Sequence, residues 1–221
     1  MDCCFKMTAL LASYIDATNL KPDATENDMR EMAKQAMQLQ VAAVCIPPVY
    51  VRLMSELLNG SQVKVCTVIG FPLAFDFFSA TRKSAALALA AGADELDLVM
   101  NLGAMRAGDH VQVVQEIKSI LQLKQEYAFL LKIIVETALW TPTELQHIVQ
   151  LLSELSIDYI KTSTGFASRG ASLEDIKTIG TYKRADVKIK ASGGIKTSEW
   201  AGELIAAGAE RLGTSSFFDL L

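Results

Sequence analysis

The chain has 221 residues, of which 51% are hydrophobic, and its net charge is −4 from 21 Lys and Arg against 25 Asp and Glu. This length suits one large α/β domain or two small ones, and the apolar fraction is enough for a substantial buried core. The basic residues are scattered along the chain, which argues against a surface for nucleic acid or for an anionic membrane.

The N-terminal segment contains an apolar patch from Met7 to Ile15. The patch is short, is preceded by Asp2 and Lys6, and is followed at once by Asp16, and no cleavage site of small residues stands out. No apolar run in the chain is long enough to span a bilayer. We therefore expect a cytoplasmic protein without a signal peptide.

The cysteines and histidines do not form a recognisable metal-binding pattern. The four cysteines are Cys3, Cys4, Cys45 and Cys66. No two of them form a C-x-x-C motif, so we expect small buried hydrophobes in a reducing compartment. His110 and His147 stand alone on apparent helical stretches, and no metal or cofactor is predicted.

Eight strand-like runs alternate with helical stretches from one end of the chain to the other. They are 14–18, 42–46, 63–69, 95–101, 130–136, 159–164, 187–192 and 211–215. Several of these runs are almost entirely apolar and rich in Val and Ile, which is typical of a parallel sheet covered by helices.

Helical periodicity and capping residues fill the gaps between the strands. The residues expected on one apolar helix face are Met29, Met32, Ala33, Ala36 and Met37. The sequence Thr-Pro-Thr-Glu at 141–144 predicts a helix start with an N-cap, a proline in the first turn and a reciprocal capping acid. Weaker versions occur at Thr25 with Asp28, Asp109 with Gln112, and Ser172 with Asp175.

A repeated unit points to a closed barrel. Residues 90–96 and 206–212 resemble each other, and in each a helix is expected to end at a glycine before a strand begins. A spacing of 29 residues separates Asp16 from Cys45, Lys132 from Lys161, and Lys161 from Lys190. We therefore predict an α/β fold, a (β/α)8 TIM barrel forming a single domain over residues 1–221. An open doubly wound sheet is the competing fold, but the glycine-rich nucleotide loop that it needs is missing.

Charged residues gather at the expected C-terminal ends of the strands. They are Asp16, Asp97, Lys132, Lys161 and Lys190. Packing alone does not justify burying three lysines with two carboxylates, although a network of paired charges that only seals the barrel is the structural alternative. A lysine amine attacks a carbonyl when it is neutral, and both desolvation and a neighbouring ammonium lower the pKa of an amine. We therefore expect Lys161 and Lys190 to lie side by side, with one acting as the nucleophile and the other supplying the positive charge that lowers the pKa of the nucleophile.

Glycines and hydroxyls at the last strand ends predict a phosphate site. Gly193 and Gly194 follow the seventh strand, and the sequence Gly-Thr-Ser-Ser at 213–216 ends the eighth. Barrels commonly bind phosphate at this position. Gly165, after the Lys161 strand, could add a further close backbone approach.

Taken together, these motifs resemble the deoxyribose-phosphate aldolase family. They are K-T-S-T-G-F at 161–166, K-A-S-G-G-I at 190–195, E-L-D-L-V-M-N at 95–101 and G-T-S-S at 213–216, with support from 15–18, 44–47, 70–72 and 132–137. The resemblance runs in order from about Tyr14 to Ser216, and the first two hexapeptides are highly specific.

The resemblance implies a class I aldolase that cleaves 2-deoxy-D-ribose 5-phosphate to acetaldehyde and D-glyceraldehyde 3-phosphate without a cofactor. Lys161 would form the Schiff base, Lys190 would lower its pKa, and Asp97 would activate a proton-shuttling water, supported by Lys132 and Asp16. The phosphate would be bound by Gly165, Gly193, Gly194, Ser215 and Ser216. Thr18 and Cys45 would also lie at the substrate site. The family further suggests a homodimer or homotetramer.

The sequence departs from the family pattern in three places. Ile15–Leu20 reads I-D-A-T-N-L where the family commonly has I-D-H-T-L-L. The segment 73–84 lacks the family's Leu-Gly and threonine-rich opening, and Thr81 and Ser84 stand where the family has a lysine and a glutamate, which bears on acceptor specificity. We expect Phe75, Phe77 and Phe78 to pack under a helix. Lys188 replaces a small residue and should share its side of the strand with Lys190.

Other functions remain open on the sequence alone. They are another Schiff-base sugar-phosphate aldolase, a phosphate-binding isomerase barrel without a Schiff base, and a catalytically silent phosphate-binding barrel. Substrate profiling separates the first from a deoxyribose-phosphate aldolase. The isomerase needs an acid–base pair rather than three lysines in the pocket, and a silent barrel could lose Lys161 or Asp97 without penalty.

Overall fold

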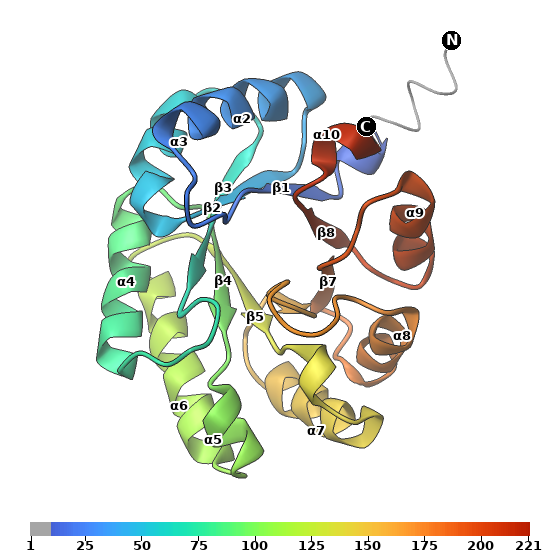
Figure 1. Ribbon diagram of the computed structural model, residues 1–221. Coiled ribbons are helices and arrows are strands. Elements are labelled where there is room, and N and C mark those ends of the chain that lie inside the picture. The colour runs from blue at the N-terminus through green and yellow to red at the C-terminus, as the bar shows by residue number, and fades with distance from the viewer. Residues whose placement is uncertain (1–9) are drawn as a thin grey trace.

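The computed structural model describes residues 10–221, which contain a closed barrel of eight parallel strands (Figure 1). The strands are β1 Ile15–Thr18, β2 Ala43–Ile46, β3 Lys64–Ile69, β4 Glu95–Val99, β5 Leu130–Ile134, β6 Tyr159–Lys161, β7 Lys188–Ser192 and β8 Arg211–Thr214. They pair in chain order, and β8 pairs with β1. The predicted (β/α)8 barrel is confirmed, and the open sheet is excluded because the edge strands pair.

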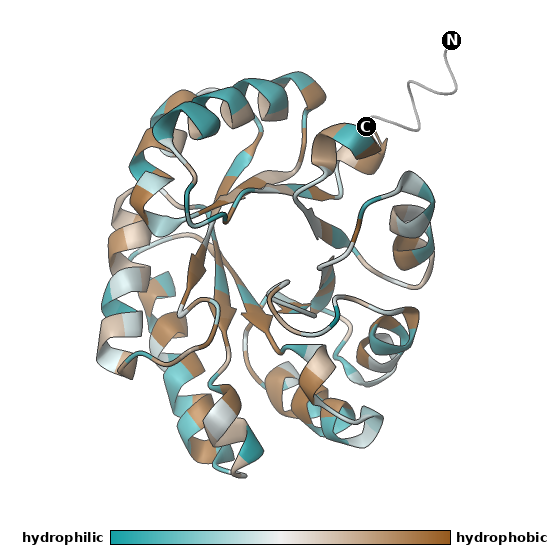
Figure 2. Ribbon diagram, in the orientation of Figure 1, coloured by the Kyte–Doolittle hydropathy of each residue, from teal (hydrophilic) through white to brown (hydrophobic). Residues whose placement is uncertain are grey.

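Helices surround the barrel in Figure 1. The α-helices are α2 Glu26–Leu39, α3 Val51–Leu57, α4 Phe78–Ala90, α5 Leu102–Arg106, α6 His110–Leu121, α7 Pro142–Ser153, α8 Leu173–Tyr182, α9 Ser198–Ala206 and α10 Phe217–Leu220. The short 3-10 helices among residues 10–221 are η1 Pro48–Tyr50, η2 Gln122–Gln125 and η3 Thr137–Leu139. Figure 2 shows mainly hydrophobic strands at β3, β4 and β5 and helices of mixed hydropathy, as expected when one face of each helix covers the sheet.

The predicted helix starts are confirmed. Thr25 and Thr141 each form a full capping box with the acid three residues later. Asp109 and Ser172 each accept a hydrogen bond from a backbone N–H of the first turn, at the starts of α6 and α8. These caps satisfy backbone N–H groups that have no partner within the helix and so fix the residue at which each helix begins.

The apolar face of α2 is confirmed except at its end. The first four of the expected residues are buried, whereas Met37 is 39% exposed, so its predicted place in the core was wrong. At 3.6 residues per turn, eight residues after Met29 bring a side chain back about 80° from the starting direction. Met37 therefore lies at the edge of the buried face.

The two repeated segments behave alike. Gly92 and Gly208 have φ angles of 105° and 117°, a region that glycine adopts without steric cost, and each lies between a helix and the next strand. At Gly92 a Cβ would also lie 2.3 Å from the Ser55 hydroxyl oxygen of α3. The expectation of a helix that ends at a glycine is confirmed in both places.

Barrel stagger decides what the spacing of 29 residues means. Lys161 is the register partner of Lys190, so this spacing places two equivalent side chains next to each other. Lys132 instead pairs with Tyr159, and Asp16 pairs with Ala43. In each of the other two pairs, the second residue lies two positions beyond the register partner of the first. Both side chains therefore still point to the inner face, but they lie at different depths of the tilted barrel.

Some expectations fall on residues that the structure does not describe. Cys3, Cys4 and the first part of the apolar patch from Met7 lie outside the described residues. Cys45 and Cys66 are buried free thiols, as predicted. Within residues 10–221, no helix is both long enough and apolar enough to cross a membrane.

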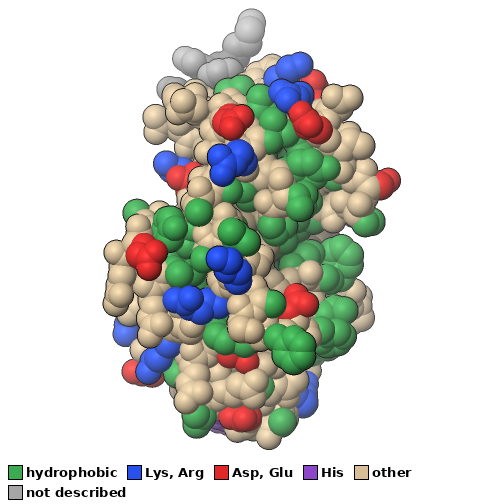
Figure 3. Space-filling view, turned by 90° about the vertical axis from the view of Figure 1, so that its left-hand side faces the viewer, with side chains coloured by type: hydrophobic (Ala, Val, Ile, Leu, Met, Phe, Trp, Pro, Cys, Tyr) green, Lys and Arg blue, Asp and Glu red, His purple; other side chains and the backbone are tan. Residues whose placement is uncertain are grey.

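The prediction that three phenylalanines pack under a helix was wrong for two of them. Phe75 and Phe77 are 85% and 87% exposed, whereas Phe78, the first residue of α4, is partly buried against the core. Phe75 and Phe77 precede the helix, in the loop from β3, and so they lie before its apolar face begins. Figure 3 looks onto the side of the barrel with α3 and α4 and shows hydrophobic side chains at its surface.

Lys188 does not join the buried charged residues inside the barrel. It is the exposed first residue of β7, whereas Lys190, two residues on, is completely buried. Strand alternation puts both side chains on the same face, but at different depths. The Lys188 Nζ lies 5.8 Å from the centre of the Tyr159 ring, a cation–π contact near the amino-terminal opening of the barrel.

Candidate active site

Seven charged side chains fill the middle of the barrel. The five predicted from the sequence all point inward and are joined by two more from strand starts, giving Asp16, Glu95, Asp97, Lys132, Lys161, Lys190 and Arg211. All of them are buried. The interior therefore holds three carboxylates and four cations, and we call this set the charge cluster.

Asp97 lies at the centre of the charge cluster because three lysines donate to its carboxylate. Lys161 Nζ and Lys190 Nζ each lie 2.7 Å from Asp97 Oδ2, and Lys132 Nζ lies 2.8 Å from Oδ1. These side chains come from β6, β7, β5 and β4, four neighbouring strands. A single carboxylate thus holds the ammonium groups of Lys161 and Lys190 on one oxygen.

Asp16 and Glu95 complete the pairing of the cations. Asp16 accepts hydrogen bonds from Lys190 and Arg211. Glu95 lies 2.6 Å from Lys132 Nζ and 3.0 Å from an Arg211 nitrogen. Buried charges that lack partners are very costly, so this pairing is what allows seven charges inside one barrel.

The pKa values follow from this pairing. Burial alone would raise the pKa of Asp97, but Lys132, Lys161 and Lys190 hold that pKa well below its usual range. Burial alone would lower the pKa of Lys190, but Asp16 and Asp97 more than offset it and raise that pKa. The pKa of Lys132 is likewise raised by Asp97 against the effect of its burial. At neutral pH Asp97 is therefore an anion, and Lys190 and Lys132 are cations.

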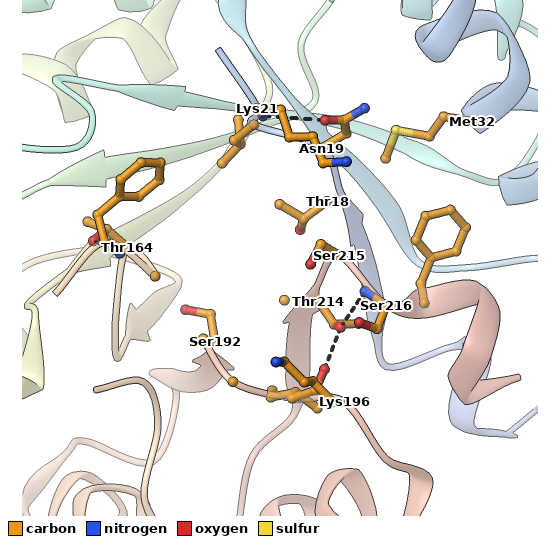
Figure 4. Close-up of a pocket in the computed structure, with 18 of the residues that line it drawn as sticks. Thr18, Asn19, Lys21, Met32, Thr164, Ser192, Lys196, Thr214, Ser215 and Ser216 are labelled. Carbon is orange, nitrogen blue, oxygen red and sulfur yellow. Dashed lines mark hydrogen bonds between the residues drawn. The ribbon is translucent and has the colours of Figure 1, made fainter. Parts of the chain in front are cut away.

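A cavity of about 520 Å³ opens above the charge cluster, and Lys161 forms part of its floor. Lys161 is the member of the charge cluster that lines this cavity, while Asp97 and Lys190 lie beneath it, completely buried. The predicted residues that line it are Thr18, Lys161, Gly165, Gly193, Gly194, Ser215 and Ser216. Figure 4 shows Thr18, Thr164, Ser192 and Ser215 around the central space, from different strand ends.

The glycines predicted for phosphate binding leave one wall of the cavity open. Gly165, Gly193 and Gly194 have φ angles of 91°, 85° and 75°. A Cβ on Gly165 or Gly194 would meet no atom within 4 Å, so both residues face empty space. Backbone therefore lines this side, and a bulky anionic group has room to approach it.

Gly213 is required by the charge cluster rather than by the cavity wall. A Cβ at this position would lie 3.2 Å from Cε of Lys190 and 3.1 Å from Cβ of Ser192. Even a methyl group would push against the stem that carries the Lys190 ammonium. This close contact is a physical reason for glycine in the G-T-S-S motif.

The backbone amide of Ser216 already has a partner. It donates to Thr214 Oγ1 at 3.0 Å, and Thr214 Oγ1 in turn donates to the carbonyl of Ile195 (Figure 4). Thr214 thus links the turn after β8 to the turn after β7. At Ser216, the hydroxyl rather than the amide is available to a ligand.

Glu136 holds the turn after β6 from the end of the neighbouring strand. Its Oε2 accepts hydrogen bonds from the backbone N–H of Thr164, at 3.1 Å, and from the Thr164 hydroxyl. Glu136 is 3% exposed and has a φ of 55°, an unusual conformation for a residue with a side chain. Thr164 and Gly165 line the cavity, so Glu136 positions a wall of the site without touching its contents.

Replacing Glu136 with alanine should raise KM roughly tenfold while kcat changes much less. Hydrogen bonds to a buried charge contribute about 1.5–3 kcal/mol, and their loss frees the Thr164 turn without altering Lys161. Steady-state kinetics of Glu136→Ala and Glu136→Gln test this, because Gln keeps an acceptor oxygen and should recover part of the KM. A fall in kcat alone would contradict the positioning role.

Cys45 lies in the interior beside the charge cluster and not on the cavity wall. It is completely buried, and its Sγ lies 4.0 Å from Asp97 Oδ2. Cys66 is its register partner on β3, and the Cys66 Sγ lies 3.2 Å from Asp97 Oδ1. A hydrogen bond from Cys66 lowers the pKa of Cys45, whereas burial raises the pKa of Cys66.

Several site residues were missed by the sequence analysis. Glu95 and Arg211 begin β4 and β8 and lie two residues before Asp97 and Gly213, so strand alternation could have placed them on the inner face. Lys21 and Lys196 line the cavity from the loops after β1 and β7. Lys196 directly follows the predicted G-G-I turn, which was a usable signal, but Lys21 carried none.

Known aldolases resemble this chain in sequence and in structure. A sequence model of the DeoC/LacD family of aldolases matches residues 10–213. The chain belongs to the DeoC/LacD aldolase family. This aldolase is 42% identical over 209 residues to the deoxyribose-phosphate aldolase of Desulfitobacterium hafniense, covering 95% of this chain and 96% of the relative. It is 45% identical over 199 residues to that of Metamycoplasma hominis, covering 90% and 91%.

A solved structure agrees with the sequence relatives. The tetrameric deoxyribose phosphate aldolase from Aeropyrum pernix superposes on this aldolase with a TM-score of 0.89 at 33% identity, covering 96% of this chain and 90% of the other. The resemblance inferred from the motifs is therefore confirmed at the level of family and fold.

Proposed function

We propose that this aldolase cleaves 2-deoxy-D-ribose 5-phosphate reversibly to acetaldehyde and D-glyceraldehyde 3-phosphate through a Schiff base on Lys161. The observation that supports this most directly is the position of Lys161. It is the member of the charge cluster that reaches the cavity, and Asp97 fixes its Nζ at 2.7 Å. The choice of substrate is supported by the similar enzymes, which are named deoxyribose-phosphate aldolases.

The chemistry needs one lysine and a way to move protons. The Lys161 amine adds to the C1 aldehyde and water leaves, giving a protonated imine. As the C3 hydroxyl loses its proton to a base, the C2–C3 bond breaks and its electron pair forms a double bond between C1 and C2. The π pair of the C=N bond moves to nitrogen, which becomes neutral in an enamine. D-glyceraldehyde 3-phosphate is released, C2 takes up a proton, and water hydrolyses the imine to acetaldehyde and free Lys161.

The charge cluster supports imine formation from below. When Lys161 gives up a proton to become nucleophilic, Asp97 Oδ2 lies within hydrogen-bond distance, and Lys190 lies 2.7 Å from the same oxygen. Lys190 remains cationic because its pKa is raised, so it disfavours a second full charge on its neighbour. Lys132 and Asp16 keep Asp97 and Lys190 in place.

We assign the phosphate group to the wall formed by Gly165, Gly193 and Gly194, and this is supported by the hydroxyl-bearing residues Ser215 and Ser216, which line the same cavity. Lys196 supplies a cation on the same side, next to the turn that contains the two consecutive glycines. Lys21 approaches from the loop after β1.

Lys196→Ala should raise KM for the phosphorylated substrate by about tenfold and leave KM for 2-deoxyribose nearly unchanged. A cation contacting a dianionic phosphate contributes on the order of 1–2 kcal/mol to binding at a half-open site. Parallel kinetics with the two sugars measure the difference. Equal increases for both would place Lys196 outside the phosphate site.

The decisive experiment is a product assay with a panel of substrates. Purified enzyme should release acetaldehyde and D-glyceraldehyde 3-phosphate from deoxyribose 5-phosphate in equal amounts, without added metal. Panel members should include keto-sugar phosphates that other Schiff-base aldolases cleave. Preference for one of those, or no turnover of deoxyribose 5-phosphate, would refute the proposed substrate.

We also propose that the enzyme is a homo-oligomer, a dimer or a tetramer, in the cytoplasm. Support comes from the similar enzyme of Aeropyrum pernix, which is described as tetrameric. Sedimentation equilibrium would decide, and a mass equal to the monomer's 24.0 kDa at all concentrations would overturn the proposal.

A further inference from the structure

Two thiols and a carboxylate meet on one side of the charge cluster. Cys45 and Cys66 are register partners on β2 and β3, and both side chains point to the barrel interior, where Asp97 from β4 faces them. One sulfur of each cysteine and one carboxylate oxygen lie within 4.8 Å of one another. The proposed aldol chemistry uses neither thiol.

The distances suit a tetrahedral metal ion. Bond lengths of about 2.3 Å to sulfur and about 2.1 Å to oxygen give an ideal sulfur–oxygen edge of roughly 3.6 Å. The two sulfur–oxygen distances here are 3.2 Å, from Cys66 Sγ to Asp97 Oδ1, and 4.0 Å, from Cys45 Sγ to Asp97 Oδ2. These distances run to different oxygens of the carboxylate. Because one of these oxygens and both sulfurs lie within 4.8 Å of one another, side-chain movements of about 1 Å are enough to form three metal–ligand bonds.

Charge balance removes the main objection to an ion at this place. Four cations already lie in the charge cluster, and an added dication alone would be repelled. Thiols bind soft metals as thiolates, however, and each releases its proton to solvent on binding. A dication with two thiolates is neutral, so the net charge of the interior does not change.

The neighbouring groups can accommodate the ion. Lys132 Nζ lies 3.3 Å from Cys66 Sγ, and its ammonium stabilises a thiolate there. If Asp97 Oδ1 turns to a metal, Lys132 keeps Glu95 as a partner at 2.6 Å. Lys132 therefore keeps a carboxylate partner when the metal is bound, and Lys161, which pairs with Asp97, is the cation that loses its partner.

We propose that Cys45, Cys66 and Asp97 form an inhibitory site for one soft divalent cation, Zn²⁺ or Cd²⁺. Sulfur ligands favour these ions over hard ones such as Mg²⁺, which prefers oxygen. A bound ion draws the Asp97 carboxylate away from Lys161 and Lys190, which both depend on its Oδ2. The inhibitory effect rests on the proposed Schiff-base function, whereas the binding does not.

The test uses Cd²⁺, because cadmium–thiolate bonds absorb in the ultraviolet. Cys3 and Cys4 could also bind the metal, so the experiment starts from the Cys3→Ser/Cys4→Ser variant of the whole chain. We expect one Cd²⁺ per chain by elemental analysis, a cadmium–thiolate absorption band, and aldolase activity that falls at least tenfold and returns when EDTA is added. Mg²⁺ at the same concentration should do neither.

The matched variants are Cys45→Ala and Cys66→Ala in the same background, with circular dichroism to confirm the fold. Each should lose most of the band. Because the site is buried, Cd²⁺ is added both to folded protein over hours and during refolding from denaturant. No band under either condition, or a band that persists in Cys45→Ala, overturns the site. A band with unchanged activity overturns only the inhibition, and activity measured without metal tests the proposed function separately.

Discussion

Lys161→Ala should lose the covalent adduct with substrate and at least about 10⁴ of kcat/KM. Without the amine no imine can form, and the C2–C3 bond must break with no electron sink. The side chain is the one point where the charge cluster meets the cavity, so no other lysine of the cluster is placed to replace it.

The measurement is borohydride reduction in the presence of acetaldehyde or deoxyribose 5-phosphate, followed by peptide mass mapping. A stable adduct is expected on Lys161 in the parent enzyme and is expected to be absent from the variant. Lys188→Ala is the matched control, because Lys188 lies at the opposite opening of the barrel and should leave both adduct and activity intact. An adduct on Lys190 would reverse the assignment of the two lysines.

The fold could be predicted because each strand has a recognisable local sequence pattern. Apolar runs with β-branched residues marked the eight strands, and capping boxes at Thr25 and Thr141 marked where helices begin. The predicted strand ends were too long by up to three residues at the C-terminal side of β6. Thr162, Ser163 and Thr164 read like strand residues, but after Lys161 the chain turns into the cavity wall.

The central lysine pair could be predicted because equal spacing on successive βα units gave the correct register, with Lys161 beside Lys190. Depth within the barrel could not be read in the same way. Cys45 lies in the interior rather than on the cavity wall, because the stagger between strands is a property of the closed barrel and not of any single segment.

Ion pairs between residues far apart in the chain could not be predicted from the sequence. Arg211 and Glu95 are 116 residues apart in the chain, and their partnership with Asp16 and Lys132 depends on barrel closure between β8 and β1. The exposed positions of Phe75 and Phe77 depend on where α4 begins, at Phe78, which no capping side chain announced. Phe71 of the same loop contacts Phe166 on the cavity wall, so this loop nevertheless reaches the site.

Lys190→Leu should slow imine formation by roughly 10–100-fold at neutral pH and move the rise of its rate to higher pH by about one to two units. Lys190 contributes one of the two ammonium groups on Asp97 Oδ2. Once it is gone, Asp97 stabilises the ammonium form of Lys161 more strongly, so formation of the neutral amine needs a higher pH.

The raised pKa of Lys190 fixes the sign and the window of this effect. A raised pKa means that the stability contributed by Lys190 is fully present below its ordinary value of 10.5 and is lost as the pH rises through the value in the folded protein. Between pH 6 and about 9, where the rates are measured, Lys190 is therefore a constant cation. A rate that rises with pH in this range cannot come from titration of Lys190 itself.

Single-turnover trapping with borohydride across this range gives the profile, and unfolding midpoints show whether the variant is folded. Asp16 keeps Arg211 and Asp97 keeps Lys132 and Lys161, so no carboxylate is orphaned and the variant should remain folded. Lys188→Leu on the same strand is the matched control and should keep the parent profile. A folded Lys190→Leu enzyme with that same profile would show that the second cation does not control the nucleophile.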